Sequence, residues 1–279
     1  MTIGKPELLV EGLVFGEGPR WRGERLWFSD MYDEAVRTVD RGGQVETVLR
    51  LPGRRPSGLG FLPDGSLLVV SMLEREILRW DGRELALHAD LRALVPDGCN
   101  DMVVDARGNA YVGSFPPVAN PAGVLALVEP GGAARLVADG LCFPNGCVVD
   151  EQGRTLIVAE SLGRRFTQFA IREDGSLAER KTFADCAPRG PDGICLDASG
   201  AIWAAFPLAR EFQRIAPGGA VLDTIPMGER LAIACTLGGA QGRTLFLLTA
   251  LEHAPEALRA TRNAAIHVVE VEVPGAGSP

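Results

Sequence analysis

Residues 63–71 read Pro-Asp-Gly-Ser-Leu-Leu-Val-Val-Ser, a turn that contains glycine followed by a short apolar run rich in β-forming residues. The same pattern occurs six times along the chain, with its glycine at Gly23, Gly65, Gly108, Gly153, Gly200 and Gly242. These glycines are 42, 43, 45, 47 and 42 residues apart. A unit of about 40–50 residues is the length of one blade of a β-propeller.

A hairpin signature lies between successive copies of this pattern. Tight turns such as Asp81-Gly82 and Asp174-Gly175 separate short apolar runs, which gives each repeat about four strands. No segment has the apolar period of 3.6 that a helical solenoid requires. The sequence therefore predicts an all-β fold: a six-bladed β-propeller with four antiparallel strands per blade, formed by residues 1–279 as a single domain. We expect Glu7–Gly12 to close the ring within the first or last blade, and residues 255–263 to form a short helix.

Composition narrows the possible partners. The net charge of −8 argues against binding to nucleic-acid phosphates or to an anionic membrane. No apolar run approaches the roughly 18 residues needed to span a bilayer, and the first residues lack the apolar stretch of a secretory signal. Six cysteines without a CxxC pair are typical of buried thiols in a reducing compartment. We expect a cytoplasmic protein, and the sequence leaves its oligomeric state open.

The repeats differ most at one position near the start of each innermost strand. Eight residues before the repeated glycine, copies two to six carry Ser57, Asn100, Asn145, Asp192 and Ala234, and a shorter turn brings Glu17 to the same place in copy one. Equivalent positions of successive blades converge on the axis of a propeller. Carboxylate and amide oxygens are the donors that hard divalent cations prefer. We predict a metal site in the central channel with the ligands Glu17, Asn100, Asn145 and Asp192. Asn or Asp before glycine is also a common turn residue, so each position alone has an ordinary structural explanation.

These residues lie in motifs that resemble the senescence-marker-protein/gluconolactonase/luciferin-regenerating-enzyme family. The motifs are Glu17-Gly-Pro, Asn100-Asp-Met-Val-Val-Asp-Ala-Arg-Gly-Asn, Pro144-Asn145-Gly, Val158-Ala-Glu-Ser-Leu-Gly-Arg and Pro191-Asp192-Gly-Ile-Cys-Leu-Asp-Ala, in the family's order across essentially the whole chain. The resemblance implies one divalent ion, Ca²⁺ first and Zn²⁺, Mg²⁺ or Mn²⁺ as alternatives. It also implies Glu17, Asn145 and Asp192 as ligands, Asn100 as a direct or water-mediated ligand, and Asp192 as the general base of lactone hydrolysis.

The chain departs from the sugar-lactone members of that family at the expected rim. Those members carry an arginine two residues before the Asn100 equivalent, where this chain has Gly98. Their acidic sugar-binding residue is replaced by the segment 114–117, Ser-Phe-Pro-Pro. We therefore expect a less hydroxylated substrate than an aldonolactone. The predicted substrate pocket contains Asn100, Ser57, Phe115, Phe143 and Phe206, although packing between blades is an alternative role for the three phenylalanines.

The expected function is a metal-dependent carboxylic-ester hydrolase that opens a small-molecule lactone. No histidine occupies the channel position, which argues against a Ser-His-Asp mechanism. Two alternatives remain. One is another enzyme on the same metal site, either an organophosphate or aryl-ester hydrolase or a non-hydrolytic cyclase. The other is a protein-binding propeller with a structural ion. Four protein ligands leave coordination positions open on Ca²⁺, which favours an enzyme.

Overall fold

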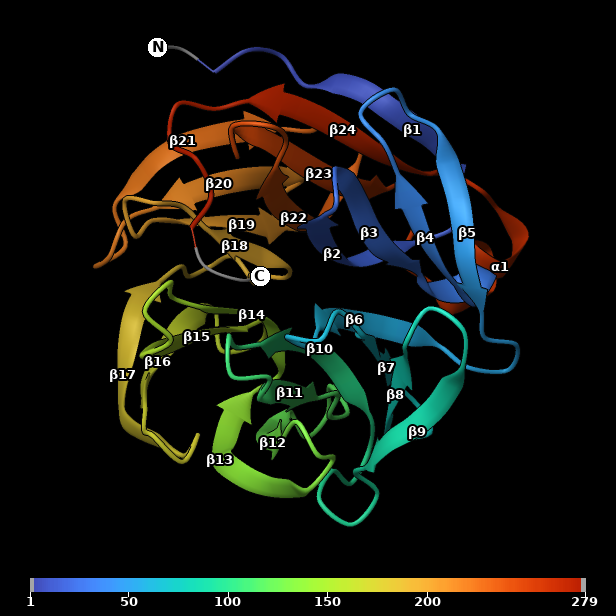
Figure 1. Ribbon diagram of the computed structural model, residues 1–279. Helices are drawn as coiled ribbons and strands as arrows, with labels where there is room; N and C mark the ends of the chain where they lie inside the picture. Colours follow the sequence, from blue (N-terminus) through green and yellow to red (C-terminus); the bar gives the residue numbers. More distant parts are fainter. Residues whose placement is uncertain (1–2, 277–279) are drawn as a thin grey trace.

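The computed structural model describes residues 3–276, and these form six four-stranded sheets arranged around a central axis (Figure 1). Every neighbouring pair of strands within a sheet is antiparallel in the pairings that the structure records. The prediction of a six-bladed propeller with four antiparallel strands per blade is confirmed.

Each blade runs outward from the axis. The innermost strands are β2 (Gly16–Arg22), β6 (Pro56–Phe61), β10 (Cys99–Val104), β14 (Pro144–Val149), β18 (Ile194–Leu196) and β22 (Leu231–Gly238). The second strands are β3 (Arg25–Asp30), β7 (Leu67–Ser71), β11 (Ala110–Ser114), β15 (Thr155–Glu160), β19 (Ile202–Phe206) and β23 (Thr244–Ala250). The third strands are β4 (Ala35–Val39), β8 (Glu76–Trp80), β12 (Ala122–Val128), β16 (Arg165–Ile171), β20 (Glu211–Ile215) and β24 (Ala264–Glu270). The outermost strands are β5 (Val45–Arg50), β9 (Leu85–Asp90), β13 (Ala134–Cys142), β17 (Leu177–Asp185), β21 (Val221–Pro226) and β1 (Glu7–Leu13).

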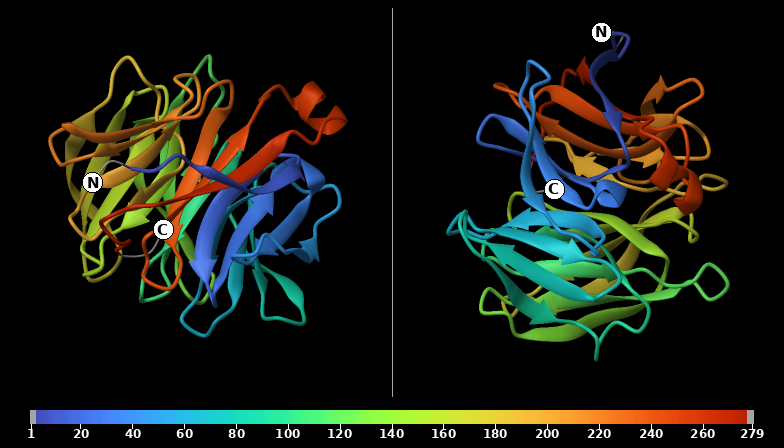
Figure 2. Two further views of the ribbon diagram at one scale, coloured as in Figure 1. Left: turned by 90° about the horizontal axis from the view of Figure 1, so that it is seen from above. Right: turned by 90° about the vertical axis from the view of Figure 1, so that its right-hand side faces the viewer.

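The first strand of the chain closes the ring. β1 pairs antiparallel with β24, so the last blade combines strands from both ends of the chain, and the expected closure is confirmed. A 3-10 turn η1 (Met31–Asp33) follows β3, and the predicted short helix is present as α1 (Pro255–Ala260). Figure 2 shows α1 projecting beyond the strands of its blade. Within the described part of the chain, no helix is long and apolar enough to cross a membrane.

Backbone geometry explains why the glycines repeat. All six repeated glycines have positive φ, from 58° at Gly23 to 95° at Gly65, in the turn between the first and second strands. A side chain at such a φ clashes with its own backbone, so glycine is favoured there. In blade 3 the carboxylate of Asp105 accepts hydrogen bonds from the backbone N–H groups of Arg107 and Asn109, each at 2.9 Å, and fixes the same turn.

The core lies between neighbouring blades. One cluster joins Val70 and Ile77 of blade 2 to Met102 and Val112 of blade 3, and all four side chains are almost fully buried. Phe206 belongs to a similar cluster between blades 4 and 5 and is 1% exposed. Stacking each sheet on the next buries both faces of every blade and leaves the ends of the strands to form the two faces of the disc.

The innermost strands contain irregularities where the candidate ligands lie. The pairing register shifts between Pro56 and Leu59 and between Cys99 and Met102, and equivalent shifts occur in β2 and β14. A β-bulge releases a residue from the ladder and turns its side chain in a new direction. The bulges therefore explain how side chains near the starts of these strands are directed away from the regular pleat.

Candidate metal centre at the channel mouth

The predicted ligands come together at one end of the innermost strands, which we call the channel mouth. Glu17, Asn100 and Asn145 are each the second residue of their strand, and Asp192 lies two residues before β18. The backbone N–H of Asp192 donates to the carbonyl of Ala205 at 2.9 Å, which anchors it on the second strand of blade 5. Asn100 is buried, whereas the other three are half-buried.

Close contact between innermost strands explains the glycine that follows most of these residues. A Cβ added to Gly18 would lie 2.7 Å from the carbonyl oxygen of Ser57. One added to Gly146 would lie 2.7 Å from the carbonyl oxygen of Asp192 and from the backbone nitrogen of Ile194. Such distances are far below van der Waals contact, so glycine lets neighbouring strands approach and bring their polar residues to the axis.

The two asparagines present their carbonyl oxygens. The side-chain nitrogen of Asn100 donates to the carbonyl of Pro144 at 3.1 Å. The side-chain nitrogen of Asn145 donates to Ser161 Oγ at 3.2 Å, and the Ser161 hydroxyl donates to the carbonyl of Pro191 at 2.7 Å. Because the protein holds the donor end of both amides, their oxygens remain available to a cation or to a donor on a ligand.

The carboxylates at the mouth interact unfavourably when no cation lies between them. Burial, together with the charges of Asp192 and Asp101, raises the pKa of Glu17 well above its usual range. Burial and the charge of Asp101 raise the pKa of Asp192 to about 7, although a hydrogen bond from the Asn145 side chain acts in the opposite direction. Because both groups keep partial contact with solvent in the channel, screening reduces this repulsion without removing it.

A buried ion pair lies beside these carboxylates. Arg20 Nη2 is 3.3 Å from Asp101 Oδ1 and also donates to the carbonyl of Met102, and Arg20 Nη1 donates to the carbonyl of Pro19 at 2.7 Å. Burial raises the pKa of Asp101, and the Arg20 guanidinium opposes that rise. When ionised, Glu17, Asp101, Asp192 and Arg20 together carry a net charge of −2, which one divalent cation would balance.

The donor set fits a hard divalent ion. Among residues 3–276, no group of three His, Cys, Asp or Glu side chains is arranged to hold a metal. A cation at the mouth would therefore use the amide oxygens of Asn100 and Asn145 in addition to the carboxylates of Glu17 and Asp192. All four donors are oxygen atoms, the ligand type of Ca²⁺ and Mg²⁺.

The predicted pocket residues fall into two groups. Phe115 is 37% exposed, Phe143 is half-buried, and their rings meet edge to face with centroids 5.1 Å apart. Ser57 is 1% exposed, and its carbonyl accepts a hydrogen bond from Ser29 Oγ. Phe206 is 1% exposed and packs in the core between blades 4 and 5, which agrees with the alternative role of packing between blades.

Sequence reasoning missed Arg20 and Asp101 as parts of this site. One signal was available for Asp101: the residue after the candidate position is glycine in copies one, two, four and five, but aspartate in copy three. No comparable signal identifies Arg20, because its partner lies 81 residues further along the chain.

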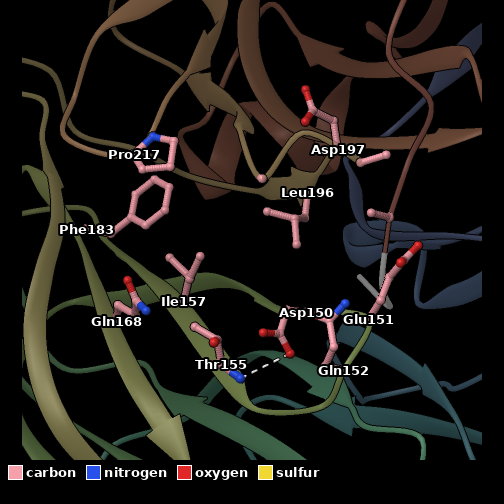
Figure 3. A pocket seen from close by; sticks show the side chains of 13 residues that line it. Asp150, Glu151, Gln152, Thr155, Ile157, Gln168, Phe183, Leu196, Asp197 and Pro217 are labelled. Carbon is pink, nitrogen blue, oxygen red and sulfur yellow. Dashed lines mark hydrogen bonds between the residues drawn. The ribbon is translucent and has the colours of Figure 1, made fainter.

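A separate cavity of about 410 Å³ lies between blades 4 and 5 at the opposite ends of their innermost strands (Figure 3). Its lining includes Asp150, which follows β14, and Asp197, which follows β18. Phe183, Ile157 and Leu196 contribute apolar side chains to the lining of this cavity (Figure 3). None of the predicted ligands lines this cavity, so it is distinct from the channel mouth.

Comparison with known proteins supports the family resemblance. The family model described as the SMP-30/gluconolactonase/LRE-like region matches residues 15–251. A 6-deoxy-6-sulfogluconolactonase from Pseudomonas putida is 26% identical over 95% of this chain and 94% of its own length. A pentonolactonase from Haloferax volcanii is 27% identical over 68% of this chain and 66% of its own length. The structure of regucalcin, a calcium-binding protein from Agrobacterium tumefaciens, superimposes with a TM-score of 0.84 at 20% identity, covering 100% of this chain and 97% of that one.

Proposed function

Because the chain belongs to the SMP-30/gluconolactonase/LRE-like family, we propose that it is a metal-dependent hydrolase that opens the ring of a lactone. The observation that carries this proposal is the pair of partly buried carboxylates, Glu17 and Asp192, flanked by two asparagines whose amide nitrogens are held by the protein. Relatives named as lactonases support the reaction class.

Glu17, Asn100, Asn145 and Asp192 would hold one divalent ion. Ca²⁺ is our first choice because every donor is an oxygen atom, and Zn²⁺, Mg²⁺ and Mn²⁺ are the alternatives. The similarity to a calcium-binding protein supports the same choice. When bound, the ion would polarise the lactone carbonyl and lower the pKa of a water molecule. These ligands come from four blades, so the site requires the propeller to act as one domain.

Asp192 is the proposed general base. Its carboxylate would take a proton from the attacking water and return it to the alkoxide that leaves when the ring opens. A base works best when its pKa lies near the working pH, and burial raises the pKa of Asp192 towards neutrality, an effect that a cation would oppose. Ser161 would act as a positioning residue, because it holds the amide of Asn145 beside Asp192.

The rim favours a lactone with fewer hydroxyl groups than an aldonolactone. Gly98 offers no side chain, and a Cβ there would meet the Phe115 side chain at 3.4 Å. The Phe115–Phe143 pair presents apolar surface where a sugar would need hydrogen-bond partners. The rim therefore supports the proposal of a less hydroxylated substrate, and the family supports the proposal of ring opening.

The test is metal reconstitution after treatment with a chelator. Ca²⁺, Zn²⁺, Mg²⁺ and Mn²⁺ are added singly, and proton release is measured on aldonolactones, plain γ- and δ-lactones and aryl esters. We expect turnover to return with metal and to fall about 10²–10⁴-fold in Asp192→Ala. Asp97→Ala is the matched control, because Asp97 is an exposed carboxylate outside the proposed ligand set. Turnover that survives chelation, or that Asp192→Ala retains, would sink the proposal.

A further inference from the structure

Exposed apolar side chains gather on the face of the propeller that carries the channel mouth. Twelve large apolar side chains are exposed among the described residues. Six of them lie on the outermost strands, and the other six lie between the second and third strands of blades 2 to 6 at the mouth face. We call these six the apolar crown: Leu73, Phe115, Val118, Leu162, Leu208 and Leu251. No member of the twelve lies in a turn of the opposite face, so random scatter does not explain the pattern.

Three blades build their part of the crown in the same way. The turns read Met72-Leu-Glu-Arg75, Ser161-Leu-Gly-Arg164 and Pro207-Leu-Ala-Arg210, with leucine always second. The final arginine of each turn has a left-handed φ, between 54° and 58°. Each leucine is exposed, by 49% at Leu73, 43% at Leu162 and 86% at Leu208.

The fold does not require leucine at these positions. The carbonyl of the final arginine accepts a backbone N–H bond in each turn, from Leu91 to Arg75, from Cys186 to Arg164 and from Met227 to Arg210, at 2.8–2.9 Å. Backbone bonds therefore fix the turns, and a polar residue at the tip would fit equally well. Turn tips are usually polar, so leucine in all three blades indicates a use outside the fold.

The crown is continuous with the candidate metal centre. Cys99, next to Asn100, donates its backbone N–H to the carbonyl of Met72 at 2.9 Å, one residue from Leu73. On the other side, Ser161 donates its backbone N–H to the carbonyl of Phe143 at 3.0 Å, one residue from Leu162. The crown thus begins within a few residues of two proposed ligands.

The aromatic pair bridges the ligands and the crown. Phe143 holds a left-handed φ of 63°, which is rare for an aromatic residue, and hydrogen bonds to Pro121 and Ser161 keep it there. In this conformation its ring meets Phe115, a member of the crown. A strained backbone conformation persists where several surrounding contacts fix it, and such residues cluster at functional sites.

We propose that the substrate is a lactone whose ring carries an apolar chain, with the ring at the metal centre and the chain lying over the crown. This inference rests on the proposed lactonase function. The crown turns join the second and third strands, so they lie about 5–10 Å outward from the innermost strand. A chain of roughly four to eight carbons spans that distance and reaches the crown side chains of the blade over which it lies.

The experiment compares the metal-loaded protein on γ-lactones from γ-valerolactone to γ-dodecalactone. We expect kcat/KM to rise about twofold per methylene, because a surface buries about half of each group and full burial corresponds to about fourfold. In the triple variant Leu73→Ser, Leu162→Ser, Leu208→Ser, kcat/KM for the long lactones should fall at least fivefold relative to γ-valerolactone. The matched control is Leu87→Ser, Leu136→Ser, Leu222→Ser, which removes three exposed leucines from outermost strands and should keep the wild-type slope.

A second measurement separates this inference from the proposed function. Calorimetry with γ-lactams that carry the same chains reports affinity without hydrolysis. If no lactone is hydrolysed but lactam affinity still rises with chain length and depends on the crown leucines, the hydrolase proposal fails, while the binding of a ring ligand's apolar chain by the crown is supported. Equal slopes in wild type and crown variant, or lactam affinity that does not depend on chain length, would overturn it. The protein could also sediment with phosphatidylcholine vesicles in a way that the crown variant loses, while kcat/KM does not change with the chain length of the lactone. That result would assign the crown to a lipid surface and would also overturn the inference.

Discussion

Raising the pH of the metal-free protein tests the electrostatics of the channel mouth most directly. The pKa of Asp192 rises from 3.8 to about 7 on folding, and that of Glu17 rises in the same direction. Between these values the folded protein binds more protons than the unfolded chain. The contribution of Asp192 to the free energy of unfolding therefore falls as the pH rises from about 4 to about 7 and levels off above its folded pKa, whereas the lowered pKa values of His88 and His267 contribute in the opposite direction.

The size of this effect follows from the shift of Asp192. About three pKa units correspond to about 4 kcal/mol as an upper bound. The Asp192 side chain keeps partial contact with solvent, so we take half of that value, ~2 kcal/mol. For 279 residues, with an unfolding entropy of about 2.1 cal/mol/K per residue, such a loss lowers the melting temperature by about 3–4 °C. A divalent ion at the proposed site should restore the loss, because it stabilises both ionised carboxylates.

Urea unfolding at a series of pH values, with chelator or with Ca²⁺, measures both effects. Asp192→Asn removes one titrating group and should flatten the metal-free curve and weaken the Ca²⁺ rescue. Asp97→Asn, at an exposed carboxylate, should leave both unchanged. A difference in metal-free stability between wild type and Asp192→Asn that does not change between about pH 4 and about pH 7 would refute the reasoning, because Asp192 would then not have a raised pKa in the folded protein.

Two further predictions concern residues that shape the mouth. In Gly146→Ala the new Cβ would lie 2.7 Å from backbone atoms of Asp192 and Ile194, so we expect the free energy of unfolding in urea to fall by about 1–3 kcal/mol. The control Gly131→Ala, where a new Cβ would meet no heavy atom within 4 Å, should have little effect. Equal losses in the two variants would contradict the close approach of the strands at Gly146. In Ser161→Ala the side-chain amide of Asn145 loses its hydrogen-bond partner, so we expect the Ca²⁺ affinity measured by calorimetry to fall about 10–100-fold while the fold is kept. An unchanged affinity would rule out Ser161 as a positioning residue.

The sequence predicts the architecture well because the fold repeats. The six repeated glycines, the first at Gly23 and the last at Gly242, have positive φ in equivalent turns, so the same backbone requirement selects glycine at six positions of the chain. Strand pairing in a propeller is mostly local, within one repeat, which makes the pattern readable without knowledge of long-range contacts. The closing strand β1 is the exception, since it pairs with β24 at the far end of the chain. Its apolar pattern predicts a strand but leaves open whether the first or the last blade receives it.

The candidate site is only partly predictable for a related reason. The repeat shows that Asn100, Asn145 and Asp192 occupy similar positions, but it does not show which way each side chain points. Phe206 illustrates the limit: it ends a second strand at the mouth face, yet its side chain is 1% exposed and packs in the core between blades 4 and 5. The direction depends on packing between blades, and no single repeat contains that information.

Asp101 shows how a departure from the repeat can create a charged centre. Copies one, two, four and five have glycine after the candidate position, which lets the innermost strands approach. In blade 3 a buried carboxylate takes that place, and it would be strongly unfavourable without Arg20 beside it. The pair is unequal in its effects, because the Asp101 charge raises the pKa of both Glu17 and Asp192, whereas Arg20 opposes that rise at Glu17. When Glu17 and Asp192 are ionised, the mouth therefore carries more negative charge than Arg20 cancels. That excess would favour the binding of the proposed divalent ion over an empty channel, and the bound ion would then contribute to the stability of the ring.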